Sequence, residues 1–145
     1  MRGKEDIEDF LDRLDSGSAE VSEVEPNLWL VKTTAGAEVV VHFAPPVVIL
    51  RVAVMELPEG AERQAALFRA LLAYNARDLV HGAYGLEGNR VVLVDTLELE
   101  NLDFNEFEAS FDSLTLALAT HLGALAPHAV DLREELREVA VRDAP

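Results

Sequence analysis

Residues Val80 to Asp103 read VHGAYGLEGNRVVLVDTLELENLD and carry the clearest indication of the fold in the chain. This stretch holds two apolar runs on either side of residues 87–90 (EGNR), and glycine and asparagine favour tight turns between strands. The pattern predicts a β-hairpin with strands at about residues 79–86 and 90–99. Neither run carries side chains in an arrangement typical of an active site, so the hairpin indicates architecture rather than chemistry.

The acidic residues after the hairpin indicate the start of a helix. Asp103 stands at the N-cap position and Glu106 at the third helical position, which completes a capping box. Leu102 and Phe107 are spaced to form a hydrophobic staple across the same junction. Apolar residues then continue at helical spacing, so we expect a helix over residues 104–126. The spacing favours this structural role for the two acids over a metal-binding or catalytic one.

The residues before the hairpin change from a helical pattern to an extended one. An apolar stripe at i, i+3, i+4 and i+7 predicts a helix over residues 5–15. A short strand at about residues 19–24 is an additional option. Pro58 suits a first helical turn and precedes an expected helix over residues 61–75. Between the two expected helices lie three β-rich runs, at residues 28–33, 38–43 and 47–57.

The order of the main elements is therefore α-β-β-β-α-β-β-α. This order predicts the α+β class, with helices packed on a twisted antiparallel sheet of about five strands. A second capping box at residues 131–134 starts a last amphipathic segment. We expect an α+β domain over residues 1–126 and a C-terminal helical extension over residues 127–145. The extension carries apolar residues on one side, at Leu132, Leu136 and Val139.

The composition restricts the classes of partner. There are 27 acidic and 12 basic residues, for a net charge of −15, and there is no cysteine. The absence of cysteine excludes disulfides, zinc–thiolate sites and thiol catalysis. The negative field repels phosphate backbones and anionic membranes, so neither nucleic acid nor a membrane is an expected direct partner. The charge is explained either by the solubility of a chain rich in apolar residues or by attraction to a basic protein.

Targeting signals are also missing from the sequence. No apolar segment follows Met1, and the longest apolar run, residues 43–54, contains two prolines and an arginine and is too short to span a bilayer. We therefore expect a cytoplasmic protein.

Residues with reactive side chains are few and dispersed. None of the four histidines forms a His-x-x-x-His pair or stands at ligand spacing from a carboxylate, so no metal, cofactor or catalytic residue is predicted. Asp95 is unusual because it shares a strand face with valine and leucine residues. Three interpretations are open. Asp95 is a catalytic base, it marks the place where the sheet edge reaches water, or it pairs with a basic neighbour such as Arg51 or Arg90.

Local patterns around the hairpin resemble a known superfamily. The run LLAYN (residues 71–75) closes a helix, HGAYGL (81–86) leads into EGNRVVL (87–93), and Leu97-x-Leu99-x-x-Leu102-Asp103 enters the next helix. Together, over roughly residues 5–126, they resemble the type III secretion chaperone-like superfamily, and within it the YbjN-domain proteins and the CesT-like (Tir chaperone) group. The resemblance implies an α+β fold, a homodimer, and a small acidic protein that binds other proteins and has no enzymatic activity.

The expected function is that of a non-enzymatic, homodimeric chaperone or adaptor that binds a segment of a basic protein. A nucleic-acid-binding protein and a secreted client both fit such a partner, and stress-response or regulatory work is equally compatible. A small-ligand-binding regulatory domain and an enzyme are the alternatives. The expected partner-binding residues are three steering acids with two apolar anchors: Glu56, Glu98, Glu100, Trp29 and Leu50.

The expected dimer interface lies on the strand at residues 47–57 and on the helix that follows it. Both faces of this strand are mostly apolar, and a sheet with helices on one side needs only one apolar face. The helix likewise carries apolar residues on more than one side. The candidate interface residues are Ile49, Val52, Val54, Phe68, Leu72 and Val92.

Overall fold

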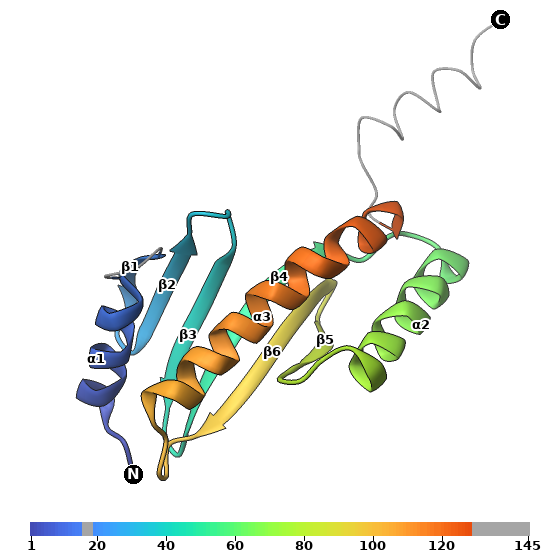
Figure 1. Cartoon of the computed structure of the whole chain (residues 1–145). Helices are drawn as coiled ribbons and strands as arrows, with labels where there is room; N and C mark the ends of the chain where they lie inside the picture. Colours follow the sequence, from blue (N-terminus) through green and yellow to red (C-terminus); the bar gives the residue numbers. More distant parts are fainter. Residues whose placement is uncertain (16–18, 129–145) are drawn as a thin grey trace, which may run out of the picture.

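A computed structural model describes residues 1–15 and 19–128 of the chain. The elements follow the order in Figure 1. The predicted helical segment that starts at Asp131 lies outside the described residues, so the division of the chain at residue 126 stays a prediction. The elements are α1 (Lys4–Asp15), β1 (Ala19–Glu25), β2 (Leu28–Thr33), β3 (Glu38–Ala44), β4 (Val47–Glu56), α2 (Ala61–Arg77), β5 (Ala83–Glu87), β6 (Arg90–Glu98), α3 (Phe104–Leu125) and the 3₁₀ helix η1 (Ala126–His128).

The α+β class and the antiparallel sheet are confirmed. In the described part of the chain the sheet has six strands in the order β1-β2-β3-β4-β6-β5, and all neighbours are antiparallel. The count exceeds the expected five because the optional strand near residues 19–24 is formed. Strand β6 lies between β4 and β5, so the chain leaves β4, passes through α2 and returns as the edge strand β5.

The predicted hairpin is present, with Glu87 opposite Arg90 across its turn. Its first strand begins at Ala83, later than expected, because the preceding Gly82 has a φ of +81° and lies against α3. A Cβ atom there would lie 2.8 Å from Leu114 Cδ2 and 2.9 Å from the Val94 carbonyl oxygen. The absence of a side chain at this position therefore lets the loop pass between α3 and the sheet.

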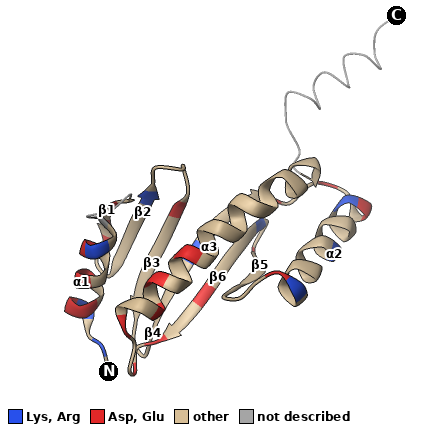
Figure 2. Ribbon diagram, in the orientation of Figure 1, with Lys and Arg blue, Asp and Glu red and all other residues tan. Residues whose placement is uncertain are grey.

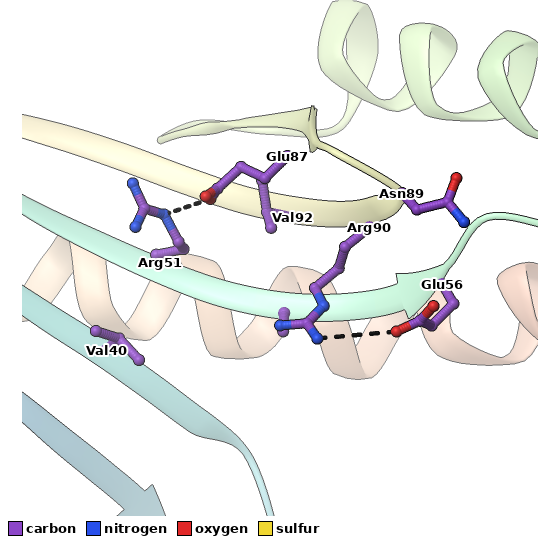
Figure 3. A pocket seen from close by; sticks show the side chains of 8 residues that line it. Val40, Arg51, Glu56, Glu87, Asn89, Arg90 and Val92 are labelled. Atoms are coloured by element: carbon purple, nitrogen blue, oxygen red, sulfur yellow. Dashed lines mark ion pairs between the residues drawn. The ribbon is translucent and has the colours of Figure 1, made fainter.

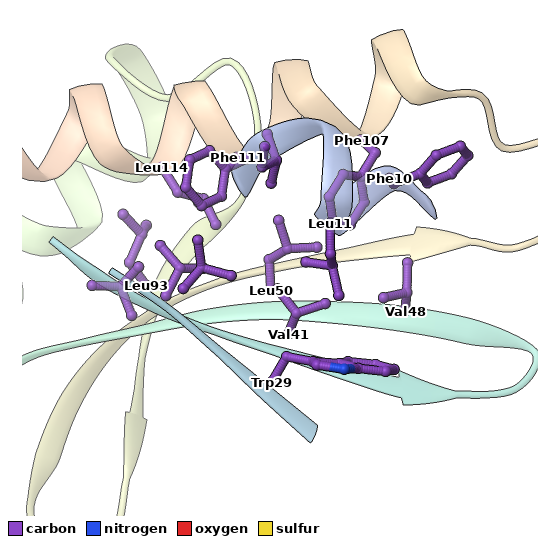
Figure 4. Packing of buried hydrophobic residues seen from close by; sticks show 14 of the residues in the cluster. Phe10, Leu11, Trp29, Val41, Val48, Leu50, Leu93, Phe107, Phe111 and Leu114 are labelled. Atoms are coloured by element: carbon purple, nitrogen blue, oxygen red, sulfur yellow. The ribbon is translucent and has the colours of Figure 1, made fainter. Parts of the chain in front are cut away.

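The hydrophobic core lies between one face of the sheet and the helices α1 and α3 (Figure 4). Alternate strand residues point into it, for example Val41, Leu50 and Leu93, which are inaccessible to solvent. Phe10 of α1 and Phe107 of α3 meet above them, with ring centroids 5.6 Å apart. The two helices, although at opposite ends of the described chain, therefore share one core.

Side-chain hydrogen bonds fix the start of α3 and the position of α2. At the start of α3 the Asp103 carboxylate accepts a hydrogen bond from the Glu106 amide at 2.8 Å, which confirms the predicted cap. Helix α2 continues past its expected end at Asn75. Instead of ending the helix, the Asn75 side chain accepts a hydrogen bond from the Tyr84 amide and donates one to the Tyr84 carbonyl. This amide thereby fastens α2 to strand β5.

We call the face of the sheet that is turned away from α1 and α3 the open face. Figure 3 views it with α3 behind the sheet and α2 beyond β5. Its side chains alternate along the strands with those of the core, and they include Val40, Ile49, Arg51, Ala53 and Val92.

Candidate partner-binding surfaces

A shallow groove of about 450 Å³ lies on the open face. Its apolar floor consists of Val40, Ala53 and Val92 from three adjacent strands, and Figure 3 labels Val40 and Val92 among them. Charged and amide side chains surround this floor: Arg51, Glu56, Glu87, Asn89 and Arg90. The groove therefore combines apolar surface with charges of both signs, a composition typical of surfaces that bind polypeptides.

Two ion pairs border this open-face groove. The Arg51 Nε atom lies 2.7 Å from Glu87 Oε1, and the side chain crosses strand β6 to reach it. This Nε atom is shielded from solvent and makes no aligned hydrogen bond, so the contact is electrostatic rather than directional. Arg90 Nη2 lies 3.8 Å from Glu56 Oε1. All four side chains are partly exposed, so each pair contributes no more than about 1 kcal/mol and can exchange partners.

Asp95 lies on the core side of the sheet and has a different partner from those expected. Its carboxylate accepts a hydrogen bond of 2.6 Å from the hydroxyl of Ser110, which is fully buried in α3. The expected pairing with Arg51 or Arg90 is wrong, because both arginines point from the other face of the sheet and pair with Glu87 and with Glu56. Asp95 therefore helps to fix α3 on β6.

A second, mostly apolar groove of about 260 Å³ lies between α2 and the edge strand β5, and we call it the α2–β5 groove. Leu72 is 67% exposed and Leu86 is 50% exposed, so two large apolar side chains face solvent side by side along it. Large apolar side chains exposed together make this groove a candidate for a protein contact. The remaining lining residues are Phe68, Leu71, Asn75, Tyr84 and Gly85.

The six predicted interface residues do not form one patch. Phe68 and Leu72 lie together in the α2–β5 groove, whereas Val92 is in the floor of the open-face groove. Ile49 is half-buried on the open face, and Val54 is half-buried at the irregularity between Ala53 and Met55 in β4. Val52 is 1% exposed and points into the core, and Val92 is only 3% exposed in the groove floor, so the prediction of both as interface residues is corrected.

Two of the predicted partner-binding residues are also corrected. Trp29 is 4% exposed and Leu50 is inaccessible, because both belong to the strand face that α1 and α3 cover (Figure 4). The Lys4 ammonium of α1 lies 5.8 Å from the centre of the Trp29 ring. Neither side chain can serve as a partner anchor while the helices stay packed on the sheet.

The three predicted steering acids are exposed but separated. Glu56 pairs with Arg90 at one end of the β4–β6 ladder, and Glu98 lies opposite Val47 at the other end. Glu100 Oε2 lies 3.4 Å from the N-terminal ammonium. Acidic side chains are spread over helices and strands rather than gathered at one point (Figure 2). The charge therefore acts as a field over the molecule, and no compact acidic site joins these residues.

A buried polar cluster joins α2, β5 and α3, and the sequence did not reveal it. The Tyr84 hydroxyl lies 2.7 Å from Nδ1 of His121, and Nε2 of the same ring lies 3.2 Å from Asp78 Oδ2. The Tyr74 ring stacks on the imidazole at 3.9 Å with an angle of 8°. Burial raises the pKa of Tyr84 to about 12, and the nearby Tyr74 and Asp78 add to this effect. The only sequence signal is that His121 falls on the apolar row of α3.

The described residues lack two features that would point to other classes of protein. Residues 1–15 and 19–128 contain no group of three or more histidine, aspartate or glutamate side chains placed to hold a metal ion. No helix within these same ranges is long and apolar enough to cross a membrane.

Solved structures share this fold at low sequence identity. The heterodimeric complex ExoU–SpcU from the type III secretion system of Pseudomonas aeruginosa matches with a TM-score of 0.58 and 16% identity, over 85% of this chain and 97% of that chain. The ExsC–ExsE complex matches with a TM-score of 0.58 and 16% identity, over 83% and 94%. The HopA1–SchA chaperone–effector complex matches with a TM-score of 0.59 and 12% identity, over 81% and 90%. These values establish a common fold.

A family model, rather than a single related protein, identifies the family. No curated protein matches this chain. The model of the CesT_Tir_1 family matches residues 1–131, a range that includes every described element from α1 to η1. The similarity to YbjN-domain proteins stays a prediction. The chain belongs to the CesT_Tir_1 family, and thereby to the type III secretion chaperone-like superfamily.

Proposed function

We propose that this protein is a non-enzymatic, homodimeric chaperone or adaptor that binds a segment of another protein on the open face of its sheet. The observation that carries the proposal is the groove with an apolar floor on the open face. The family supports it, and so do the matched structures, since HopA1–SchA is a chaperone–effector complex and ExoU–SpcU is a heterodimer. We expect it to act in the cytoplasm.

The favoured partner is an extended or helical segment with apolar side chains and a positive net charge. Apolar groups of the segment would cover Val40 and Ala53, while its basic groups would compete for Glu56 and Glu87. The net charge of −15 would speed the encounter with a basic partner. A secreted effector and a basic nucleic-acid-binding protein both meet this description.

The proposed dimer uses the α2–β5 groove. A two-fold axis beside α2 would bring Leu72 and Phe68 of one copy against the same residues of the other, because such interfaces are self-complementary. A stable interface of this kind buries roughly 800 Å² per partner. This assignment leaves the open face free for the client.

The test uses one substitution in the groove and one on the other side of the sheet. Ala53 is exposed in the floor of the open-face groove, and Ala109 is exposed on α3. With a partner recovered from native lysate and then purified, Ala53→Arg should weaken binding at least about tenfold, since it places bulk and charge where apolar groups dock. Ala109→Arg should leave the affinity unchanged. Equal affinities for the two variants would refute the assignment of the open face.

A further inference from the structure

A third apolar surface lies at the C-terminal half of α3, away from both grooves described above. A depression of about 280 Å³ runs between α3 and the loop that follows α2, and we call it the α3–loop groove. Val80 is 85% exposed and Leu116 is 68% exposed beside it. The other lining residues are Asp78, Leu79, Ser113, Ala117, Thr120 and His121. Two large apolar side chains so exposed at one groove indicate that another segment covers them.

The position of this groove identifies the segment that can reach it. The described chain ends in η1, which contacts both α2 and α3 at the same end of the molecule. On an α-helix, Leu116 lies about 14 Å before Leu125, at 1.5 Å per residue. Residues 129–145 follow directly. Even if wholly helical, these residues span about 25 Å, which is enough to return along α3 beyond Leu116.

The sequence of this segment also matches the groove chemically. Leu132, Leu136 and Val139 recur at i, i+4 and i+7, the spacing that forms one apolar stripe on a helix. Arg133 and Arg137 form a second row directly beside the stripe. The groove has complementary charges, because Asp78 lines it and Asp112 precedes Leu116 by one helical turn. An isolated helix of this length is marginal in water, so docking would supply the stability that it lacks.

We propose that residues 129–145 occupy the α3–loop groove of their own chain, antiparallel to α3. In this arrangement the stripe of Leu132, Leu136 and Val139 covers Val80 and Leu116. The arginine row faces the two aspartates. The inference does not depend on the client or on the dimer, because the open-face and α2–β5 grooves share no residue with this one.

Disulfide trapping in the full-length chain tests the docking, and the natural absence of cysteine leaves no background. Oxidation of Leu116→Cys with Leu136→Cys should give an intramolecular disulfide in most molecules. Leu122 is 54% exposed on another side of α3, so Leu122→Cys with Leu136→Cys is the matched control and should react at least about tenfold less. Equal reaction of the two pairs would overturn the proposal. A bond that forms between copies, seen by mixing chains of different mass, would overturn it as well.

Proteolysis provides a second readout that needs no cysteine. Trypsin cleaves after arginine, and the segment contains Arg133 and Arg137. Cleavage after these residues should be about tenfold faster in Leu116→Glu than in the natural protein, because the loss of one buried leucine contact opens the segment by that factor. Leu122→Glu should cleave at the natural rate. Fast cleavage in all three proteins would show that the segment does not dock.

Discussion

The two faces of the sheet are built from the same strands but have different compositions. On β4, Leu50 is sealed beneath α1 and α3, whereas its neighbour Arg51 lies on the open face and crosses β6 to pair with Glu87. The covered face is mostly apolar, with Asp95 as its polar exception, and the open face mixes valine and alanine with arginine and glutamate. One face of the sheet therefore holds the fold together, while no described helix covers the other, on which we propose that a partner binds.

The largest effect should come from truncation on the covered face. Leu50→Ala should lower the free energy of unfolding by about 3 kcal/mol, because it leaves a cavity in a packed core. Ile49→Ala, at the adjacent half-buried position on the open face, should cost only about 1 kcal/mol. Urea unfolding of both variants measures the contrast. Equal losses would mean that the two faces do not differ as described.

The next largest effect is the pH dependence of the free energy of unfolding that comes from the hydroxyl of Tyr84 on the covered face. The pKa of Tyr84 is raised from 10 to about 12 by burial, so the folded protein holds this proton more tightly than the unfolded chain. The neutral phenol then contributes on the order of 2 kcal/mol to the free energy of unfolding below pH 10, and this contribution is lost as the pH rises toward 12. In Tyr74→Phe, Tyr84 is the only tyrosine left, and its near-ultraviolet absorbance should still titrate well above pH 10, because burial, the main cause of the raised pKa, is retained.

The urea-denatured form of the same variant is the control for this titration, and it should titrate near pH 10. A folded protein that forms tyrosinate near pH 10 as well would contradict the burial of the Tyr84 hydroxyl.

A smaller effect is expected where the sheet ends at β5. Leu72→Glu should raise the dissociation constant of the proposed dimer about tenfold, since it places a charge in an apolar contact. Leu122→Glu, at another exposed leucine, should leave it unchanged. Sedimentation over a range of concentrations gives both constants. If Ile49→Glu dissociates the dimer and Leu72→Glu does not, the dimer forms through the open face instead.

The smallest effect is expected from the distributed charge. Glu98→Lys combined with Glu100→Lys should weaken binding of a basic partner about threefold at low salt, because exposed charges act at long range. The difference should vanish at high salt. Binding titrations at several salt concentrations check this, and an affinity indifferent to both the substitutions and the salt would remove electrostatic steering from the proposal.

The parts of the fold that depend on neighbouring residues could be predicted from the sequence. The turn between Glu87 and Arg90 and the cap at Asp103 are confirmed because each is decided within a few residues of the chain. The class and the order of elements follow from the same local patterns. The sequence signal for the additional strand β1 was weak, because four of its seven residues are charged or otherwise polar.

Features that depend on which face is covered could not be predicted. Trp29 and Leu50 were predicted as anchors but are buried, since the alternation of side chains along a strand does not say on which face the helices pack. The contacts of His121 with Tyr84 and Asp78 join residues that are 37 and 43 positions apart. Asp95 is a similar case, because its partner Ser110 belongs to a helix whose rotation on the sheet is a tertiary property.

The strand order has a consequence for the protein as it leaves the ribosome. Strands β1 to β4 follow one another as successive hairpins, but the second edge of β4 pairs only with β6, which is synthesised after α2 and β5. Until Glu98 has emerged, the nascent sheet ends in an unpaired apolar strand, and such edges attract other chains. A protein that we propose binds segments of other proteins therefore passes through a stage at which its own nascent chain exposes an edge strand that can pair with other chains.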